Sequence, residues 1–254
     1  MRRPLADDLA DRILDDVLAG RYDTGTALPS ESELAEEAGL SRLTVREAVK
    51  TLRSKGVLRV VQGRGTYVAP TEEWSVLDPT LLIARSAAQA DALLMPLKFI
   101  EARRLVEVGV AELAATRRSE KDVGQLEDSL AEMRRASRVK DVGGFVQADI
   151  AFHQIILDAA DNAFVAAIFD PLAQILRLTR YQTSAHAPVR RHAIAHHDNI
   201  LKAITTGDPT AAREAMHAHI VQTENDMVKY VRDPAAALTE LRGSDLRRVS
   251  HDSV

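Results

Sequence analysis

Residues 28–68, LPSESELAEEAGLSRLTVREAVKTLRSKGVLRVVQGRGTYV, decide the fold of the first part of the chain. Ser30 stands where a side chain can cap a helix, and Glu33 follows at the capping-box position. Gly39 can end that helix, and Ser41 is the candidate cap of the next one. The sequence therefore predicts two short helices joined by a tight turn, which is typical of a helix-turn-helix.

The second of these helices has an apolar face and a cationic face. Its apolar positions are Val45, Ala48, Val49 and Leu52, and its basic positions are Arg42, Arg46, Lys50 and Arg53. Residues 41–64 carry seven basic side chains against Glu47 alone, a net charge of +6, within a chain whose net charge is −4. A solvated face on a structural helix is the simpler interpretation. The caps, the turn and the charge together favour instead a helix that enters the major groove of DNA.

The sequence predicts one more helix and a hairpin around this motif. The earlier helix is amphipathic, with apolar side chains at Leu9, Ala10, Ile13, Leu14 and Val17. After the basic helix, the β-rich runs VLRVV and TYV flank a turn that contains Gly63 and Gly65. Three helices and a β-hairpin over residues 1–70 make a winged helix-turn-helix, with the hairpin as its wing.

The rest of the chain is helical in pattern, so the fold class is mainly α. Residues 71–80, which include TEEWSVLDPT, are expected to form a linker. Residues 81–232 show no strand pattern, and their helix breakers divide them into six or seven helices that should pack as a bundle. Residues 233–254 lose the apolar periodicity and are expected to be a mobile tail.

Composition excludes several classes of protein. The 254 residues contain no cysteine, so neither a disulfide nor a thiolate metal site is possible. The sequence has no long apolar run of the kind that spans a membrane, and MRRPLADDLADRI lacks the apolar stretch of a signal peptide. We therefore expect a cytoplasmic protein without a membrane partner.

An acid and a histidine lie on the apolar side of a predicted helix. Asp149 and His153, in the sequence DIAFH, share a face with Phe145, Val146 and Ile156. Leaving such a group buried without a partner costs on the order of 1 to 3 kcal/mol. One interpretation is a local hydrogen bond between the two within a core helix. The other is that they bind something together with residues elsewhere in the chain.

Later histidines bear on that choice. His197 lies at the centre of an apolar stripe formed by Ile194, Ile200, Leu201 and Ile204, whereas His196 lies about 100° away around the helix. In AREAMHAHI the periodicity does not decide whether His217 or His219 faces the core. Arg103 also lies on an apolar stripe, with Glu107 at i+4, and is either half of an intrahelical salt bridge or a group that clamps a carboxylate ligand.

Two known families resemble this sequence over roughly residues 5 to 230. The stretch 28–68 closely resembles the winged helix-turn-helix of the GntR family of bacterial transcription regulators. The helical remainder resembles the FCD ligand-binding domain of the FadR-like subfamily through EARRLVE, DIAFH, HHDNILKAITTGD and AMHAHI. The resemblance implies a homodimer that binds an inverted-repeat operator in double-stranded DNA and responds to a small carboxylate metabolite.

The resemblance also assigns DNA contacts to matching positions. They are Ser32, Ser41, Arg42, Leu43, Arg46, Gln62 and Gly63. Arg42 and Arg46 can each make a bidentate contact to guanine, and the serines can donate to phosphate. Leu43 departs from the small or hydroxyl residue often found at its position, and it can only contact a thymine methyl group or a sugar.

In the FCD domain, the resemblance implies a divalent metal held by one Asp and three His. The matching residues are Asp149, His153, His197 and His219, so that the resemblance selects His219 where periodicity did not. Nitrogen and oxygen ligands of this kind suit zinc, nickel or manganese. Arg103 would then bind the carboxylate of the effector beside the metal.

The leading hypothesis is thus a metabolite-responsive DNA-binding transcription regulator that is not an enzyme. A metal-dependent hydrolase or lyase would use the same Asp and His residues, but it needs a poised general base, and the sequence contains no HExxH motif. A DNA binder with a purely structural helical domain would leave the inward polar residues without a role.

Overall fold

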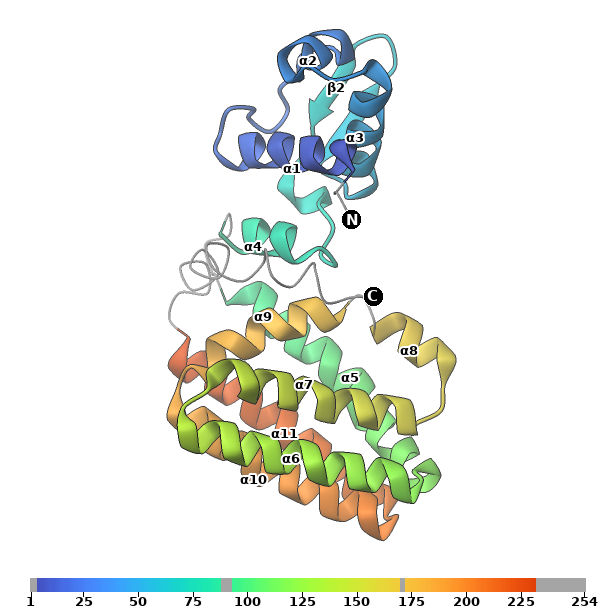
Figure 1. Ribbon diagram of the computed structural model, residues 1–254, viewed down its shortest axis with the longest axis vertical. Coiled ribbons are helices and arrows are strands. Elements are labelled where there is room, and N and C mark those ends of the chain that lie inside the picture. Colours follow the sequence, from blue (N-terminus) through green and yellow to red (C-terminus); the bar gives the residue numbers. More distant parts are fainter. Residues whose placement is uncertain (1–3, 88–92, 170–171, 232–254) are drawn as a thin grey trace. The chain divides into compact units, whose positions relative to one another are not determined.

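The computed structural model describes residues 4–87, 93–169 and 172–231 (Figure 1). The chain forms two compact units, which divide near residue 88. Each has its own hydrophobic core. The tail expected over residues 233–254 lies outside the described residues.

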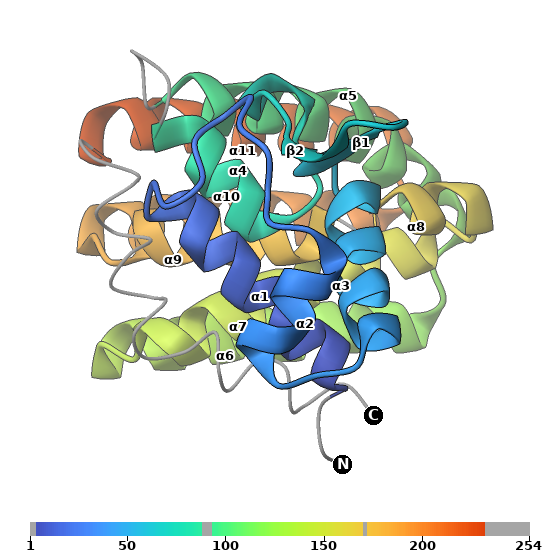
Figure 2. The ribbon, with the colours of Figure 1, turned by 90° about the horizontal axis from the view of Figure 1, so that it is seen from above.

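The N-terminal unit begins with three helices and a two-stranded antiparallel hairpin (Figure 2). The elements are α1 (Leu5–Leu18), α2 (Glu31–Ala38), α3 (Arg42–Ser54), β1 (Leu58–Val61) and β2 (Gly65–Val68). Leu58 pairs with Val68 at one end of the hairpin, and Val61 pairs with Gly65 at its tip. The buried side chains of α1 and α3 pack against one another, which confirms the expected winged helix-turn-helix.

Local hydrogen bonds define the two central helices. The Ser30 hydroxyl accepts from the Glu33 backbone N–H at 3.3 Å, and the Glu33 carboxylate accepts from the Ser30 backbone N–H at 2.7 Å. These bonds favour the charged form of the carboxyl group and lower the pKa of Glu33. Gly39 ends α2 with a φ of 64°, and the Ser41 hydroxyl caps α3 by accepting from the Thr44 N–H at 3.1 Å.

The structure differs from the expected linker over residues 71–80. This segment holds a short 3-10 helix, η1 (Thr71–Glu73), and the start of α4 (Pro79–Ala87). Trp74 is buried in the N-terminal core, where its indole N–H donates to the Ala69 carbonyl at 3.0 Å, and Leu81 of α4 joins the same core. The large apolar area of an indole explains why this polar-looking segment packs on the unit.

The C-terminal unit is all helical, and seven helices are described in it. They are α5 (Leu94–Arg117), α6 (Glu120–Val139), α7 (Val142–Ala159), α8 (Ala163–Phe169), α9 (Ala173–Ser184), α10 (Ala187–Thr206) and α11 (Pro209–Tyr230). Helix α5 packs on α11, α6 on α7 and α10 on α11. Their side chains enclose one core, which includes Phe145, Phe152 and Met216. This bundle is the one expected from the sequence.

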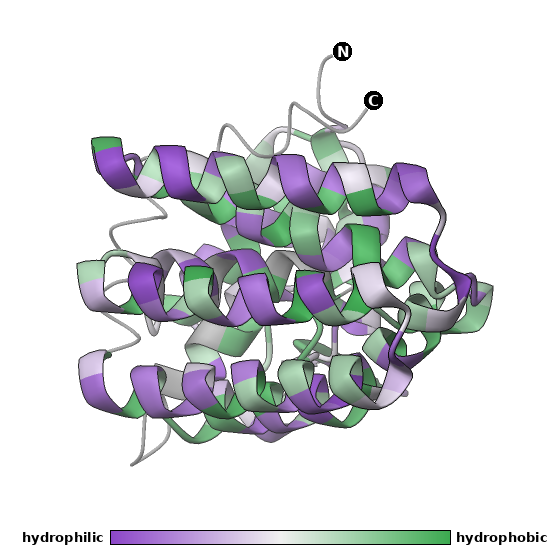
Figure 3. Ribbon diagram, turned by 90° about the horizontal axis from the view of Figure 1, so that it is seen from below, coloured by the Kyte–Doolittle hydropathy of each residue, from purple (hydrophilic) through white to green (hydrophobic). Residues whose placement is uncertain are grey.

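Helices α6 and α10 are amphipathic. Figure 3 shows hydrophilic and hydrophobic residues alternating along the helices that face the viewer. Capping residues mark their ends: Ser119 forms a capping box with Asp122 at the start of α6, and Asp208 caps α11 ahead of Pro209. Within the described ranges, none of the helices combines the length and the apolar character that crossing a membrane requires.

The approach of η1 to Gly56 gives a prediction on stability. Gly56 has a φ of 76°, and a Cβ atom built there would clash with the backbone carbonyl of Glu73. Gly56→Ala should therefore destabilise the N-terminal unit by roughly 1–3 kcal/mol more than the backbone strain alone costs. Denaturant unfolding of the purified protein measures this difference.

Gly25→Ala is the matched control. Gly25 has a φ of 83°, but nothing lies within 4 Å of a Cβ atom built there. Equal loss of stability in the two variants would mean that the backbone of Glu73 and Trp74 is not packed tightly against Gly56.

Candidate metal centre and DNA-binding face

The residues with predicted DNA contacts all lie on the surface of the N-terminal unit. Ser32 is on α2, Ser41 caps α3, and the first turns of α3 carry Arg42, Leu43 and Arg46. Gln62 and Gly63 form the tip of the hairpin, and each of the seven residues is exposed. The exposed fraction of Leu43 is 67%, so its apolar side chain is open to solvent. Exposure makes these groups available to DNA but does not by itself assign their roles.

Arg46 contacts an acid of the neighbouring helix. Its Nη2 and Nε atoms lie 3.1 and 3.2 Å from Glu31 Oε2. Both side chains are exposed to solvent, at 64% for Arg46 and 36% for Glu31. Exposed pairs of this kind contribute little stability, so the guanidinium can exchange Glu31 for a base edge at low cost.

The hairpin tip is a tight turn with open space beside Gly63. The Arg64 N–H donates to the Val61 carbonyl at 2.9 Å and closes the turn. Gly63 has a φ of 71°, and no atom lies within 4 Å of a Cβ atom built there. The position therefore requires glycine for its backbone conformation, and the space beside it is open.

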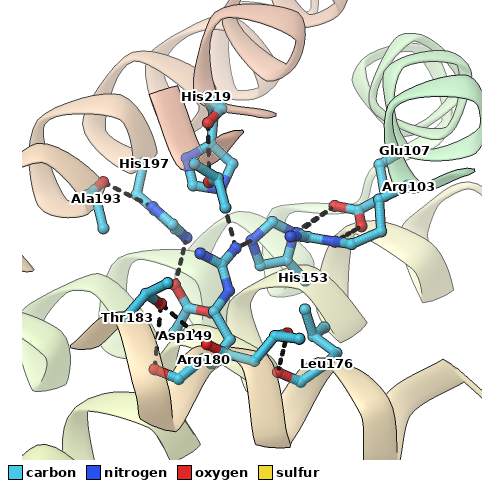
Figure 4. Close-up of polar contacts among 12 residues, drawn as sticks. Arg103, Glu107, Asp149, His153, Leu176, Arg180, Thr183, Ala193, His197 and His219 are labelled. Carbon is cyan, nitrogen blue, oxygen red and sulfur yellow. Dashed lines mark hydrogen bonds and ion pairs between the residues drawn. The ribbon is translucent and has the colours of Figure 1, made fainter. Parts of the chain in front are cut away.

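In the C-terminal unit the four predicted metal ligands converge (Figure 4). Asp149 and His153 project from α7, His197 from α10 and His219 from α11, and all four are buried. The ligating nitrogens of the three histidines lie within 4.8 Å of one another. His217 is exposed, and His196 is only half-buried. Thus α11 directs His219 into the bundle, the choice that periodicity had left open.

The proton positions on two of the rings follow from their neighbours. His153 Nδ1 lies 2.8 Å from Glu107 Oε2, and a carboxylate can only accept, so Nδ1 carries the proton. His197 Nδ1 lies 2.7 Å from the Ala193 carbonyl, which also only accepts. In their neutral forms both rings therefore present the Nε2 lone pair to the centre.

The contact between His197 and Asp149 is unsatisfied. His197 Nε2 lies 3.4 Å from Asp149 Oδ1, and neither atom has a hydrogen-bond partner. A neutral imidazole has one proton, which its Nδ1 already donates to Ala193, so two acceptors face each other. A second proton would resolve this, but burial lowers the pKa of His197 to about 3. A cation between the two atoms would satisfy both.

Burial and neighbouring charges keep His219 and Asp149 in the protonation states that metal ligands need. The pKa of His219 is lowered well below its ordinary value, first by burial and then by His197 and Arg180. Burial alone would raise the pKa of Asp149, but the nearby Arg180 and His197 lower it overall. The centre thus contains the neutral imidazoles of His197 and His219 and the carboxylate of Asp149, which are donors suited to a divalent ion.

Arg103 is paired with an acid on its own helix. Its Nε and Nη2 atoms lie 2.6 and 3.2 Å from the two oxygens of Glu107, and both residues are buried. Burial would raise the pKa of Glu107, but Arg103 and His153 hold it below its ordinary value. Because Glu107 Oε2 also lies 2.8 Å from His153 Nδ1, Arg103 is linked to the centre through Glu107. The salt bridge foreseen as one alternative is therefore present, and a role in effector binding stays a prediction.

Sequence reasoning missed Arg180. This residue of α9 has an exposed fraction of 3%, and its Nε lies 2.8 Å from Asp149 Oδ2. Its Nη2 lies 3.1 Å from both His153 Nε2 and His219 Nε2. One signal was available: Arg180 follows the buried Leu176 at i+4, which places it on the inner face of α9.

Two family descriptions match the chain. Residues 5–68 match the family described as bacterial regulatory proteins, gntR family, and residues 98–222 match the FCD domain. The first match covers the three helices and the hairpin, and the second covers the helices that carry the buried centre.

Curated relatives are similar over most of their length. The chain is 31% identical to the HTH-type transcriptional regulator LutR of Bacillus subtilis, over 84% of this chain and 97% of that protein. It is 30% identical to the galactonate operon transcriptional repressor of Escherichia coli, over 78% and 86% of the two chains. The same identity, over 95% and 94%, relates it to the putative L-lactate dehydrogenase operon regulatory protein of Escherichia coli.

Proposed function

Because the chain belongs to the GntR family of bacterial regulatory proteins and carries an FCD domain, we propose that it binds an inverted-repeat DNA operator as a dimer and senses a small carboxylate in a metal-containing helical domain. At the coarser level, it is a metabolite-responsive bacterial transcription regulator. Its named relatives are regulators rather than enzymes, which argues against the hydrolase or lyase alternative. We further propose a cytoplasmic location, because bacterial DNA lies there.

The DNA-binding proposal rests on the exposed start of α3. Arg42 and Arg46 lie there, in a stretch of net positive charge, and both can pair with a guanine edge. Ser32 and Ser41 would contact phosphates, Leu43 a thymine methyl or sugar, and Gln62 and Gly63 the groove beside the wing. A single recognition helix reads few base pairs, so two-fold pairing on a palindromic site supplies the missing selectivity.

The metal proposal rests on the facing acceptors, His197 Nε2 and Asp149 Oδ1. A divalent ion held by Asp149, His153, His197 and His219 would satisfy them and would attract the oxygens of an anionic ligand as a Lewis acid. Zinc, nickel and manganese all suit this donor set. In a purely structural helical domain these two buried acceptors would stay in contact without a donor, which would destabilise the folded protein.

The names of two relatives suggest which kind of carboxylate the effector is. Galactonate and L-lactate, the acids in their names, both carry a hydroxyl group beside the carboxylate. A 2-hydroxycarboxylate can offer two oxygens to an ion that accepts more donors than the four side chains supply. We infer that the effector of this chain is a small carboxylate of this kind.

Base reading by Arg46 can be tested on an operator selected from random oligonucleotides with the wild-type protein. Arg46→Ala should weaken operator binding by about 1 to 3 kcal/mol and affect random DNA much less, because it removes a base contact. Lys50→Ala, on the same exposed side of α3, should weaken binding to both DNAs more evenly. Equal losses on the two DNAs for the Arg46 variant would show that this arginine only contacts the backbone.

Metal binding can be tested by element analysis of protein refolded with zinc, nickel or manganese. His197→Ala should remove the metal and lower the thermal stability of the loaded protein, because the loss of a ligand weakens a complex that binds only the folded state. DNA binding without effector should largely survive, since the N-terminal unit has its own core.

His196→Ala is the control, since it changes the adjacent, half-buried histidine on the same helix. It should retain the metal and the stability. Comparable metal loss in the two variants, or no metal in the wild-type protein, would return Asp149 and His153 to a hydrogen-bonding role in the core.

A further inference from the structure

The buried guanidinium of Arg180 lies within hydrogen-bond distance of three of the four proposed ligands (Figure 4). It reaches the centre from α9, a helix that supplies none of those ligands. A cation is therefore already held at the point where α7, α10 and α11 present their polar side chains.

The contacts of this guanidinium use lone pairs that a metal also needs. A guanidinium only donates, so His153 Nε2 and His219 Nε2 each accept from Arg180 Nη2 through their ring lone pair. Each imidazole nitrogen has one such lone pair, and it cannot serve an N–H donor and a metal ion at once. The two cations are mutually exclusive at these atoms.

A displaced Arg180 would have neither of the two nearby buried carboxylates, Glu107 and Asp149, free to pair with it. Arg103 is already paired with Glu107 through both carboxylate oxygens. Asp149, the partner of Arg180, would be bound to the ion. Because a buried guanidinium without an anion is costly, Arg180 would need a new partner, and its fork of donors matches a carboxylate.

We propose that Arg180 and a divalent ion compete for the lone pairs of His153 and His219, and that the displaced guanidinium becomes the partner of the effector carboxylate. This inference rests on the proposed metal site and adds a residue to it. It makes Arg180, rather than the Arg103 expected from the sequence, the carboxylate-binding group. It also couples the two ligands, because a carboxylate that holds the displaced guanidinium favours the ion.

Competition titration of Ni²⁺ against a chromophoric chelator tests the first half. Arg180→Gln should bind Ni²⁺ tighter than wild type by on the order of tenfold or more, since a charge-assisted contact no longer competes. Arg177→Gln, three residues earlier on α9, is the matched control and should leave the affinity unchanged. Arg180→Lys retains the charge without the fork and should fall between the wild-type and Gln variants, which provides a second test if Arg180→Gln does not fold.

Acetate, a carboxylate without the hydroxyl group, tests the second half in the same titration. It should raise the Ni²⁺ affinity of the wild-type protein relative to chloride at equal ionic strength. The increase should be clearly smaller in Arg180→Gln, where only the ion attracts the acetate oxygens. An acetate effect of equal size in both proteins would overturn the carboxylate-binding role of Arg180.

The other outcomes separate this inference from the proposed function. Equal or weaker Ni²⁺ binding by Arg180→Gln, with the wild-type protein binding normally, would overturn the competition while leaving the metal site intact. Absence of Ni²⁺ binding in every variant, wild type included, would overturn both.

Discussion

The polar centre of the C-terminal unit depends on where His197 carries its one proton. His197 donates its Nδ1 proton to the Ala193 carbonyl, so its Nε2 can offer only a lone pair to the Asp149 carboxylate. Both residues are fully buried, and burial keeps the imidazole neutral by lowering its pKa. A cation is the remaining way to satisfy the pair. The helices that bring His153 and His219 to the same point place two more lone pairs around it, and Arg180 shows that a positive group can be accommodated there.

The N-terminal unit depends on different physics. The side chains that are predicted to contact DNA are exposed. Their positions are fixed by the backbone of α2 and α3, through the capping box of α2, the left-handed conformation of Gly39 and the Ser41 cap of α3. Its polar contacts at the surface, such as Arg46 with Glu31, are weak enough to be exchanged for DNA. One chain thus combines a surface whose contacts are easily replaced with a buried centre whose contacts are costly to leave unmet. That contrast suits a regulator whose sensor must respond to a specific ligand.

Local signals in the sequence predicted most of the fold. Caps at Ser30, Ser41 and Asp208 and the glycines after α2 and α10 act within a few residues, so they can be recognised without the tertiary structure. His197 was predicted to be inward because its stripe is long and regular, whereas His219 needed the family resemblance. Two features were missed for the same reason: the packing of Trp74 on the N-terminal core and the entry of Arg180 into the centre both depend on partners distant in sequence. The position of Arg180 four residues after Leu176 indicates that it faces inward, but it does not indicate which residues it contacts.

We expect the buried centre of the C-terminal unit to hold a divalent ion. Anomalous-difference crystallography of protein loaded with zinc or nickel tests it most directly, because the signal comes from the metal alone. We expect one strong anomalous-difference peak per chain. It should lie at about 2.0–2.2 Å from the Nε2 atoms of His153, His197 and His219 and from a carboxylate oxygen of Asp149. We also expect the Arg180 guanidinium to have moved off the histidine nitrogens. A centre without a peak, with the metal bound instead at exposed histidines and Arg180 still in place, would contradict these expectations.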